Sequence, residues 1–248
     1  MKNSLVTKII YRAVSCTVSL FSVLFITGFF SVGGSDTATF TKDLFYYYTN
    51  LSNYLCFGVW LVCLKDDAKQ LRSGKLFGYN QNPILKYMKF SATVIISITF
   101  IAYGLLLSDP LKLNFWNNIA NLCYHVAVPV LFIIDTVLFD EHKSVGILDA
   151  LLAAVLPIIY VVVIEIMGSQ TGRYPYFFLD MGQLGFGGLM MWIGILLSLF
   201  LAIGYALFLY DKLVRVNGKW KFDFKGTKLV GAGGKEDPSV SAKTRETN

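Results

Sequence analysis

Six long apolar runs constrain the fold of this chain more than any other feature. Each has about the 17–25 residues that a helix needs to cross a hydrocarbon core of roughly 30 Å. Backbone polar groups inside a bilayer must find partners within their own segment, so these runs are predicted to be helices. The runs cover residues 13–30, 46–64, 90–107, 116–139, 145–167 and 185–210. We therefore expect an all-α, polytopic membrane protein with six transmembrane helices in one bundle.

The composition favours a membrane protein over a soluble domain. Of the 248 residues, 55% are hydrophobic and 15% are charged, and the mean hydropathy is +0.56. A soluble domain carries about 25% charged residues. The four cysteines lie within the apolar runs and form no CxxC pair, which is typical of small buried side chains. Because the sequence contains no zinc, haem or phosphate-loop pattern, we expect neither a metal nor a cofactor.

The basic residues predict the orientation in the membrane. With six crossings, both termini lie on the same side. That side receives nineteen Lys and Arg residues, whereas the other receives only Lys42, Lys112 and Arg173. Lys and Arg concentrate in cytoplasmic loops, so both termini are expected in the cytoplasm. The net charge of +6 then reflects topology and contact with anionic lipid, and we expect no nucleic-acid partner.

The chain divides into a membrane domain and a short tail. Residues 1–212 are expected to form the six-helix transmembrane domain, and residues 213–248 a basic cytoplasmic tail. Alternating apolar and polar residues around Asn217-Gly218 predict a β-hairpin at the start of this tail. The Gly-, Ser- and charge-rich remainder is predicted to be partly disordered.

A stripe of polar residues marks one face of the fourth run. Asn114, Asn118, Asn121 and His125 follow one another at spacings of four, three and four residues. That spacing places them on one face of a helix. Polar side chains at membrane depth normally face the bundle interior or a wet cavity, and they often mark function. The simpler interpretation is that the asparagines only join helices.

Thr49 is the candidate nucleophile that could act with His125. Thr49 and Asn53 share a face near the outer end of the second run, and His125 lies in the outer half of the fourth. A hydroxyl becomes a useful nucleophile when a base such as imidazole removes its proton. Asn121 could orient the imidazole, and Asn50, Asn53 or Asn118 could donate hydrogen bonds to an oxyanion. The simpler interpretation is that Thr49 bonds to its own helix backbone.

Several further polar residues lie near the ends of the runs. Glu165, near the outer end of the fifth run, is a third site candidate, although it could simply reach water. Asp135 is expected to pair with a basic residue on the inner side. Pro129, one turn after His125, removes a backbone hydrogen bond and could kink the helix beside the ring. The aromatic loop at 168–186 lies outside, either as an aromatic belt or as a lid, and its Arg173 could bind a carboxylate or phosphate.

Three segments resemble the androgen-induced protein family of six-span intramembrane threonine hydrolases and related bacterial membrane proteins. YYYTNLSN is similar to the family's threonine motif, NLCYHVAVP to its histidine motif, and TGRYPYFFLD to an outer loop. The resemblance implies a nucleophile at Thr49, a base at His125, and substrate-binding roles for Tyr174 and Asp180. It also implies hydrolysis of esters between fatty acids and hydroxy fatty acids, without metal, in a bacterial plasma membrane.

The leading hypothesis is therefore an intramembrane lipid-ester hydrolase with a threonine nucleophile and a histidine base. The expected partners are the bilayer and a membrane lipid or fatty-acid ester that enters laterally between helices. Two alternatives stay open: acyl transfer between lipids by the same residues, and non-catalytic binding or transport of a lipid or small molecule.

Overall fold

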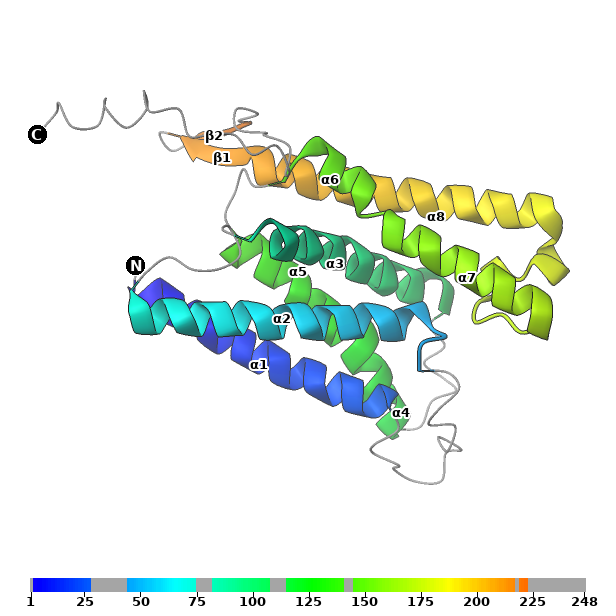
Figure 1. Cartoon of the computed structure of the whole chain (residues 1–248), viewed down its shortest axis with the longest axis horizontal. Coiled ribbons are helices and arrows are strands. Elements are labelled where there is room, and N and C mark those ends of the chain that lie inside the picture. The colour runs from blue at the N-terminus through cyan, green and yellow to red at the C-terminus, as the bar shows by residue number, and fades with distance from the viewer. Residues whose placement is uncertain are drawn as a thin grey trace, which may run out of the picture.

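The computed structural model describes residues 2–27, 44–74, 82–107, 115–140, 145–216 and 219–222. Helices make up almost all of this part of the chain (Figure 1). The elements are α1 (Lys2–Ile26), α2 (Tyr48–Ser73), α3 (Pro83–Ala102), η1 (Tyr103–Leu107), α4 (Phe115–Leu122), η3 (Cys123–Ala127), α5 (Val128–Phe139), α6 (Ile147–Leu152), α7 (Val155–Thr171), η4 (Phe177–Leu179), α8 (Met181–Lys212), β1 (Leu213–Val216) and β2 (Lys219–Phe222).

Five helical segments are long and apolar enough to cross a bilayer. They are Leu5–Ile26, Pro83–Leu107, Ile119–Phe139, Ile147–Thr171 and Met181–Lys212. These segments confirm an all-α fold and indicate a multi-pass integral membrane protein. They correspond to five of the six expected runs. The second run forms α2, which has 26 residues but is less apolar than the other five.

The polarity of α2 follows from its position inside the bundle. It lies between α1 and α3 and contacts both (Figure 1). Its buried face includes Thr49, Ser52, Asn53 and Asp67 beside apolar residues such as Trp60. A helix surrounded by protein can carry polar groups if its neighbours satisfy them.

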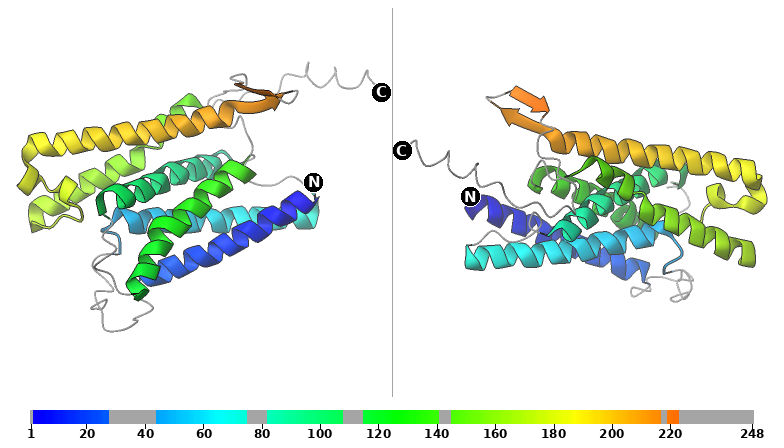
Figure 2. Two further views of the ribbon diagram at one scale, coloured as in Figure 1. Left: turned by 180° about the vertical axis from the view of Figure 1, so that it is seen from behind. Right: turned by 45° about the horizontal axis from the view of Figure 1, so that its top comes forward.

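The bundle consists of a tight group of helices and a second layer. Helices α1, α2, α3 and α5 share one apolar core around Trp60 and Phe132. Helices α6 and α8 pack on α3 through a second core around Phe200 and Phe208. Seen from behind, α4 and α5 cross the bundle obliquely, while α7 and α8 lie on the far side of α3 from α1 (Figure 2). The start of α1 and the end of α8 lie at the same end of the molecule (Figure 1).

Proline and glycine explain three of the interruptions of regular helix in the described residues. Pro129 has no N–H to offer the carbonyl of His125, and the turn before it widens into the π-helix η3. Pro157 likewise follows a break at Ala153 and Ala154, which splits the expected fifth run into α6 and α7. Gly185 adopts φ 65° and ψ 170°, a conformation open to glycine, and it kinks the start of α8.

The helix ends differ from the expected boundaries, whereas the hairpin is confirmed. Strands β1 and β2 pair antiparallel with Leu213 opposite Phe222, and the Asn217-Gly218 turn lies outside the described residues. Helix α2 continues to Ser73, nine residues beyond the expected end, before Gly74 ends it in the left-handed conformation. Helix α3 begins at Pro83, because the side chain of Asn82 accepts hydrogen bonds from the first turn.

A network of buried charges joins four helices near the end of the bundle that contains the N-terminus of α1. The Arg12 guanidinium donates to Asp135 at 2.8 Å and to Asp67 at 2.7 Å. The Lys89 ammonium pairs with Asp135 at 2.8 Å and with Asp140. Trp60 Nε1 donates to Asp135 at 3.1 Å.

The charges of this network are buried. Arg12 is 2% exposed and Lys89 and Asp135 are fully buried, so each charge depends on the others for solvation. The expected pairing of Asp135 with a basic residue is confirmed.

We predict that Asp135→Asn destabilises the protein by about 3 kcal/mol, because it leaves two buried cations short of a carboxylate. Thermal unfolding in detergent measures the effect. Asp66→Asn is the matched control, since Asp66 is on α2 and makes no ion pair with the described residues. Equal unfolding temperatures for the two variants would contradict a structural role for this network.

Candidate active site

Thr49 and His125 meet inside the protein. The Thr49 Oγ1 atom lies 3.3 Å from His125 Nε2. Thr49 is 7% exposed and His125 is 9% exposed, so bulk water has little access to either side chain. A hydroxyl at this distance from an imidazole nitrogen can pass its proton to that nitrogen after a small approach. The geometry is that of a nucleophile beside its base.

Irregular helical segments position the imidazole ring. His125 is at the centre of η3, and its ring stacks on Tyr103, the first residue of η1. The two ring centroids are 3.9 Å apart and the planes differ by 6°. The Tyr124 ring also packs edge-on against the imidazole, with centroids 4.5 Å apart. The ring therefore comes from one π-helical segment and packs on a residue of the other. Such segments are often associated with functional sites.

The second nitrogen of the imidazole ring, Nδ1, has weaker hydrogen bonding than Nε2. His125 Nδ1 is buried and makes no hydrogen bond of standard geometry to the described residues. The main-chain carbonyl of Asn121, one turn earlier, is close enough to interact with the ring. The Asn121 side chain accepts a hydrogen bond from the Tyr124 hydroxyl at 3.1 Å instead. The orienting role expected for Asn121 can thus come from its backbone, while its side-chain oxygen is bonded to Tyr124.

Asn53 holds the two catalytic candidates together. Its Nδ2 atom donates to the main-chain carbonyls of Thr49, at 2.8 Å, and of Tyr124, at 3.0 Å. Its Oδ1 atom accepts from Ser22 of α1 at 3.1 Å. Since both N–H groups of the amide are occupied, Asn53 links three segments and has no donor left for an oxyanion.

Asn50 and Asn118 are the other two asparagines proposed as oxyanion donors. Asn50 is half-buried one residue after Thr49. Asn118 lies in α4, but its side chain is outside the described residues, as is the whole of Asn114. The oxyanion role expected for these amides therefore stays a prediction.

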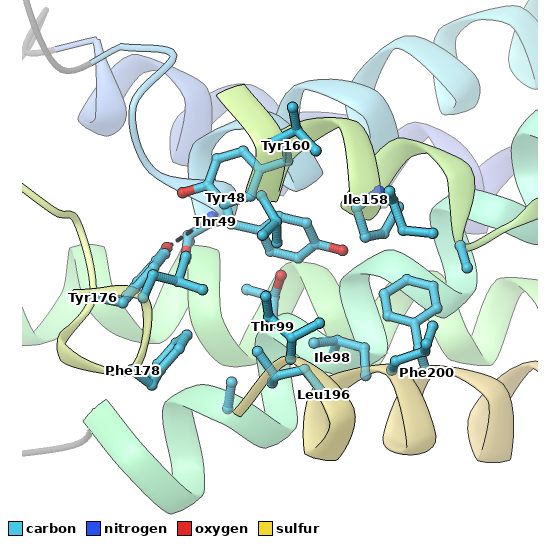
Figure 3. Close-up of a pocket in the computed structure, with 18 of the residues that line it drawn as sticks. Tyr48, Thr49, Ile98, Thr99, Ile158, Tyr160, Tyr176, Phe178, Leu196 and Phe200 are labelled. Atoms are coloured by element: carbon cyan, nitrogen blue, oxygen red, sulfur yellow. Dashed lines mark hydrogen bonds between the residues drawn. The ribbon is translucent and has the colours of Figure 1, made fainter. Parts of the chain in front are cut away.

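An apolar cavity of about 300 Å³ opens beside Thr49 (Figure 3). It lies between α2 and α3 on one side and α7 and α8 on the other. Its wall includes Thr99 and Phe200, and Tyr48, Tyr160 and Tyr176 surround the end near Thr49 (Figure 3). Three residues of the wall, Ile158, Val162 and Leu197, are also exposed on the outer surface of α7 and α8. The cavity thus lies within reach of the lipid-facing surface.

The segment between α7 and α8 folds back over the bundle. Phe178 and Leu179 are buried in an apolar cluster with Ile164 and Leu189. Tyr176 reaches the start of α2, where its hydroxyl accepts from the Thr49 N–H at 3.4 Å (Figure 3). Of the two interpretations of this loop, the structure supports the lid over the simple aromatic belt.

The remaining outer candidates do not contact the pair. Arg173 is exposed, and Asp180 caps α8 by accepting from the Gln183 N–H at 3.1 Å. Tyr174 packs so closely on Gly168 that any Cβ there would overlap the ring. Both carboxylate oxygens of Glu165 are buried and lack a hydrogen bond to the described residues. These four positions lie around the C-terminal end of α7, and the roles expected for them stay predictions.

Sequence reasoning missed two tyrosines and the cavity. Tyr103 precedes His125 by 22 residues, and Tyr176 follows Thr49 by 127 residues. Because aromatic residues near span ends are common, neither tyrosine stood out in the sequence. The Tyr-Pro-Tyr run was the one available signal for Tyr176. The cavity arises from the spacing of α7 and α8 over α3, which no local pattern encodes.

Comparison of the chain with protein-family models, curated proteins and solved structures found no match.

We predict that Asn53→Ala loosens the pair and destabilises the fold by about 2 kcal/mol, because two buried carbonyls lose their donor. Unfolding temperature and the rate of Thr49 labelling by a fluorophosphonate should both fall. Gln70→Ala removes an amide from the same helix, away from the site, and is the control. Labelling of Asn53→Ala at the wild-type rate would contradict the positioning role.

Proposed function

We propose that this protein is an intramembrane hydrolase of lipid esters, with Thr49 as nucleophile and His125 as base. The observation that carries the proposal is the 3.3 Å contact between Thr49 Oγ1 and His125 Nε2 at the wall of an apolar cavity. Neither residue is required by its helix to face the other. Burying these two polar side chains together in a largely apolar bundle costs free energy, and polar residues at such positions are typically functional.

The proposed chemistry proceeds in two stages. His125 Nε2 accepts the Thr49 proton while Oγ1 attacks the ester carbonyl, and the proton then passes to the departing alcohol as its C–O bond breaks. Water next attacks the acyl-threonine by the same route, which releases the fatty acid and restores Thr49. Nδ1 carries the ring proton throughout, and the Asn121 backbone lies close to the ring.

The cavity is suited to the acyl chain of the substrate. A volume of about 300 Å³ is at the lower end of the range for small-molecule sites. Its wall is apolar except for the residues near Thr49 and Thr99. We propose that the chain enters between α7 and α8 from the lipid, since Ile158, Val162 and Leu197 connect the cavity wall to the outer surface.

We further propose that α2 is a sixth membrane-crossing helix and that both termini are cytoplasmic. Helix α2 lies between the candidate spans α1 and α3 and packs on both (Figure 1). The excess of Lys and Arg at the end that holds the start of α1 supports this orientation. Thr49 and His125 then lie in the outer half of the membrane. The motif resemblance to the threonine hydrolases agrees with this arrangement.

One observation favours the alternative of a lipid-binding protein without catalysis. A hydrolytic histidine usually has a third group that fixes its tautomer, and here Nδ1 makes no hydrogen bond of standard geometry to the described residues. A binding protein would need the cavity but not the proton transfer. Activity measurements on variants separate the two.

We predict that Thr49→Ala and His125→Ala each lower kcat by at least about 100-fold, because each removes a participant in proton transfer. The assay is hydrolysis of p-nitrophenyl octanoate by purified protein in detergent. Thr49→Ser keeps a hydroxyl and should retain activity. Equal rates for wild type and both alanine variants, with binding of the ester intact, would favour the binding protein instead.

We also predict that Ala102→Phe shortens the acyl site. Excluding about two methylenes from the cavity costs roughly 1.6 kcal/mol, or about tenfold in affinity. KM should therefore rise for p-nitrophenyl dodecanoate and change little for the butanoate. Ala202→Phe, exposed on α8, is the control for added bulk. A uniform change across chain lengths would argue against the cavity as the acyl site.

A further inference from the structure

The start of α2 offers a hydrogen-bond donor that its own helix does not use. The N–H groups of Asn50 and Leu51 both donate to the Tyr47 carbonyl. The N–H of Thr49 instead donates to the Tyr176 hydroxyl oxygen at 3.4 Å. A contact of this length is weak, so the donor can readily turn to a better acceptor. Main-chain donors at a helix start also benefit from the helix dipole.

The Tyr176 hydroxyl lies where negative charge would develop in the proposed reaction. The Thr49 side chain and the Tyr48 N–H also approach this oxygen, so it is directly beside the atom that attacks the ester. Burial raises the pKa of Tyr176 above its ordinary value, so the hydroxyl keeps its proton at neutral pH. Tyr176 itself is held by a ring stack on Phe178 at 5.0 Å and an edge contact with Tyr47 at 6.1 Å.

We infer that the Thr49 N–H and the Tyr176 O–H together form the oxyanion hole of this site. As Oγ1 attacks, the electron pair of the carbonyl π bond moves onto its oxygen, and both groups donate hydrogen bonds to that oxygen without transferring a proton. The nucleophile's own N–H has this role in serine proteases. Preorganised donors of this kind are worth most in a site that excludes water.

This assignment rests on the proposed hydrolase function and deepens it. It replaces the amide donors suggested by the sequence, of which Asn53 is already occupied by two carbonyls. It also gives the folded-back loop a chemical purpose. Because Tyr176 belongs to that loop and Thr49 to α2, the oxyanion hole is complete only while the loop covers the start of α2.

The test is the effect of Tyr176→Phe on steady-state hydrolysis of p-nitrophenyl octanoate by the full-length protein. Loss of one oxyanion donor should lower kcat about 100-fold while KM stays near the wild-type value. Tyr210→Phe is the matched control, because it removes one hydroxyl that donates to the Val137 carbonyl at 2.8 Å between α8 and α5. Labelling by a fluorophosphonate should slow in parallel with kcat.

The outcomes distinguish this inference from the function on which it rests. Unchanged or faster turnover by Tyr176→Phe, with wild type active, overturns the oxyanion assignment and leaves the hydrolase intact. A wild-type protein that cleaves no ester overturns both. If Tyr176→Phe does not fold, fluorotyrosine at this position keeps the ring and makes its hydroxyl a stronger donor. In that variant, a kcat equal to wild type contradicts a donor role, and a raised kcat at mildly acidic pH supports it.

Discussion

The structure depends on one constraint: polar groups buried in an apolar bundle must satisfy one another. Helix α2 carries buried polar groups near both of its ends, and these two ends are anchored in different ways. Near its end, Asp67 joins the charges of Arg12, Lys89 and Asp135. Near its start, Asn53 joins α2 to α1 and to the Tyr124 carbonyl. These contacts fix the depth and rotation of α2, and thereby the place of Thr49.

The two ends differ in how completely their groups are paired, and this difference indicates where chemistry can occur. In the charge network Arg12, Lys89 and Asp135 all have short contacts with opposite charges. The side chain and the N–H of Thr49 make longer contacts, at 3.3 Å to His125 and 3.4 Å to Tyr176. Groups that are held in place but incompletely paired can exchange their partners for a substrate at low cost. The cavity beside them supplies the space for that substrate.

The sequence predicted the helices well because hydrophobic length is a local property. The rise per residue along a helix also led to the prediction that Thr49 and His125 lie in the same half of the membrane, although at different depths. It could not predict that α2 and η3 adjoin, nor that Tyr103 would stack on His125. Those contacts depend on helix rotation and on the π-helical segments, which are set by packing between distant parts of the chain. The break before Pro157 and the extension of α2 to Ser73 have similar causes.

The most direct test of the account identifies the residue that becomes covalently modified. Purified protein is treated with a fluorophosphonate, digested and analysed by mass spectrometry, with His125→Ala treated in parallel. A phosphonyl group on Thr49 of the wild type, and its absence from His125→Ala, is the result that a His-activated threonine predicts. An adduct on another residue, or equal modification of Thr49 in both proteins, would contradict it.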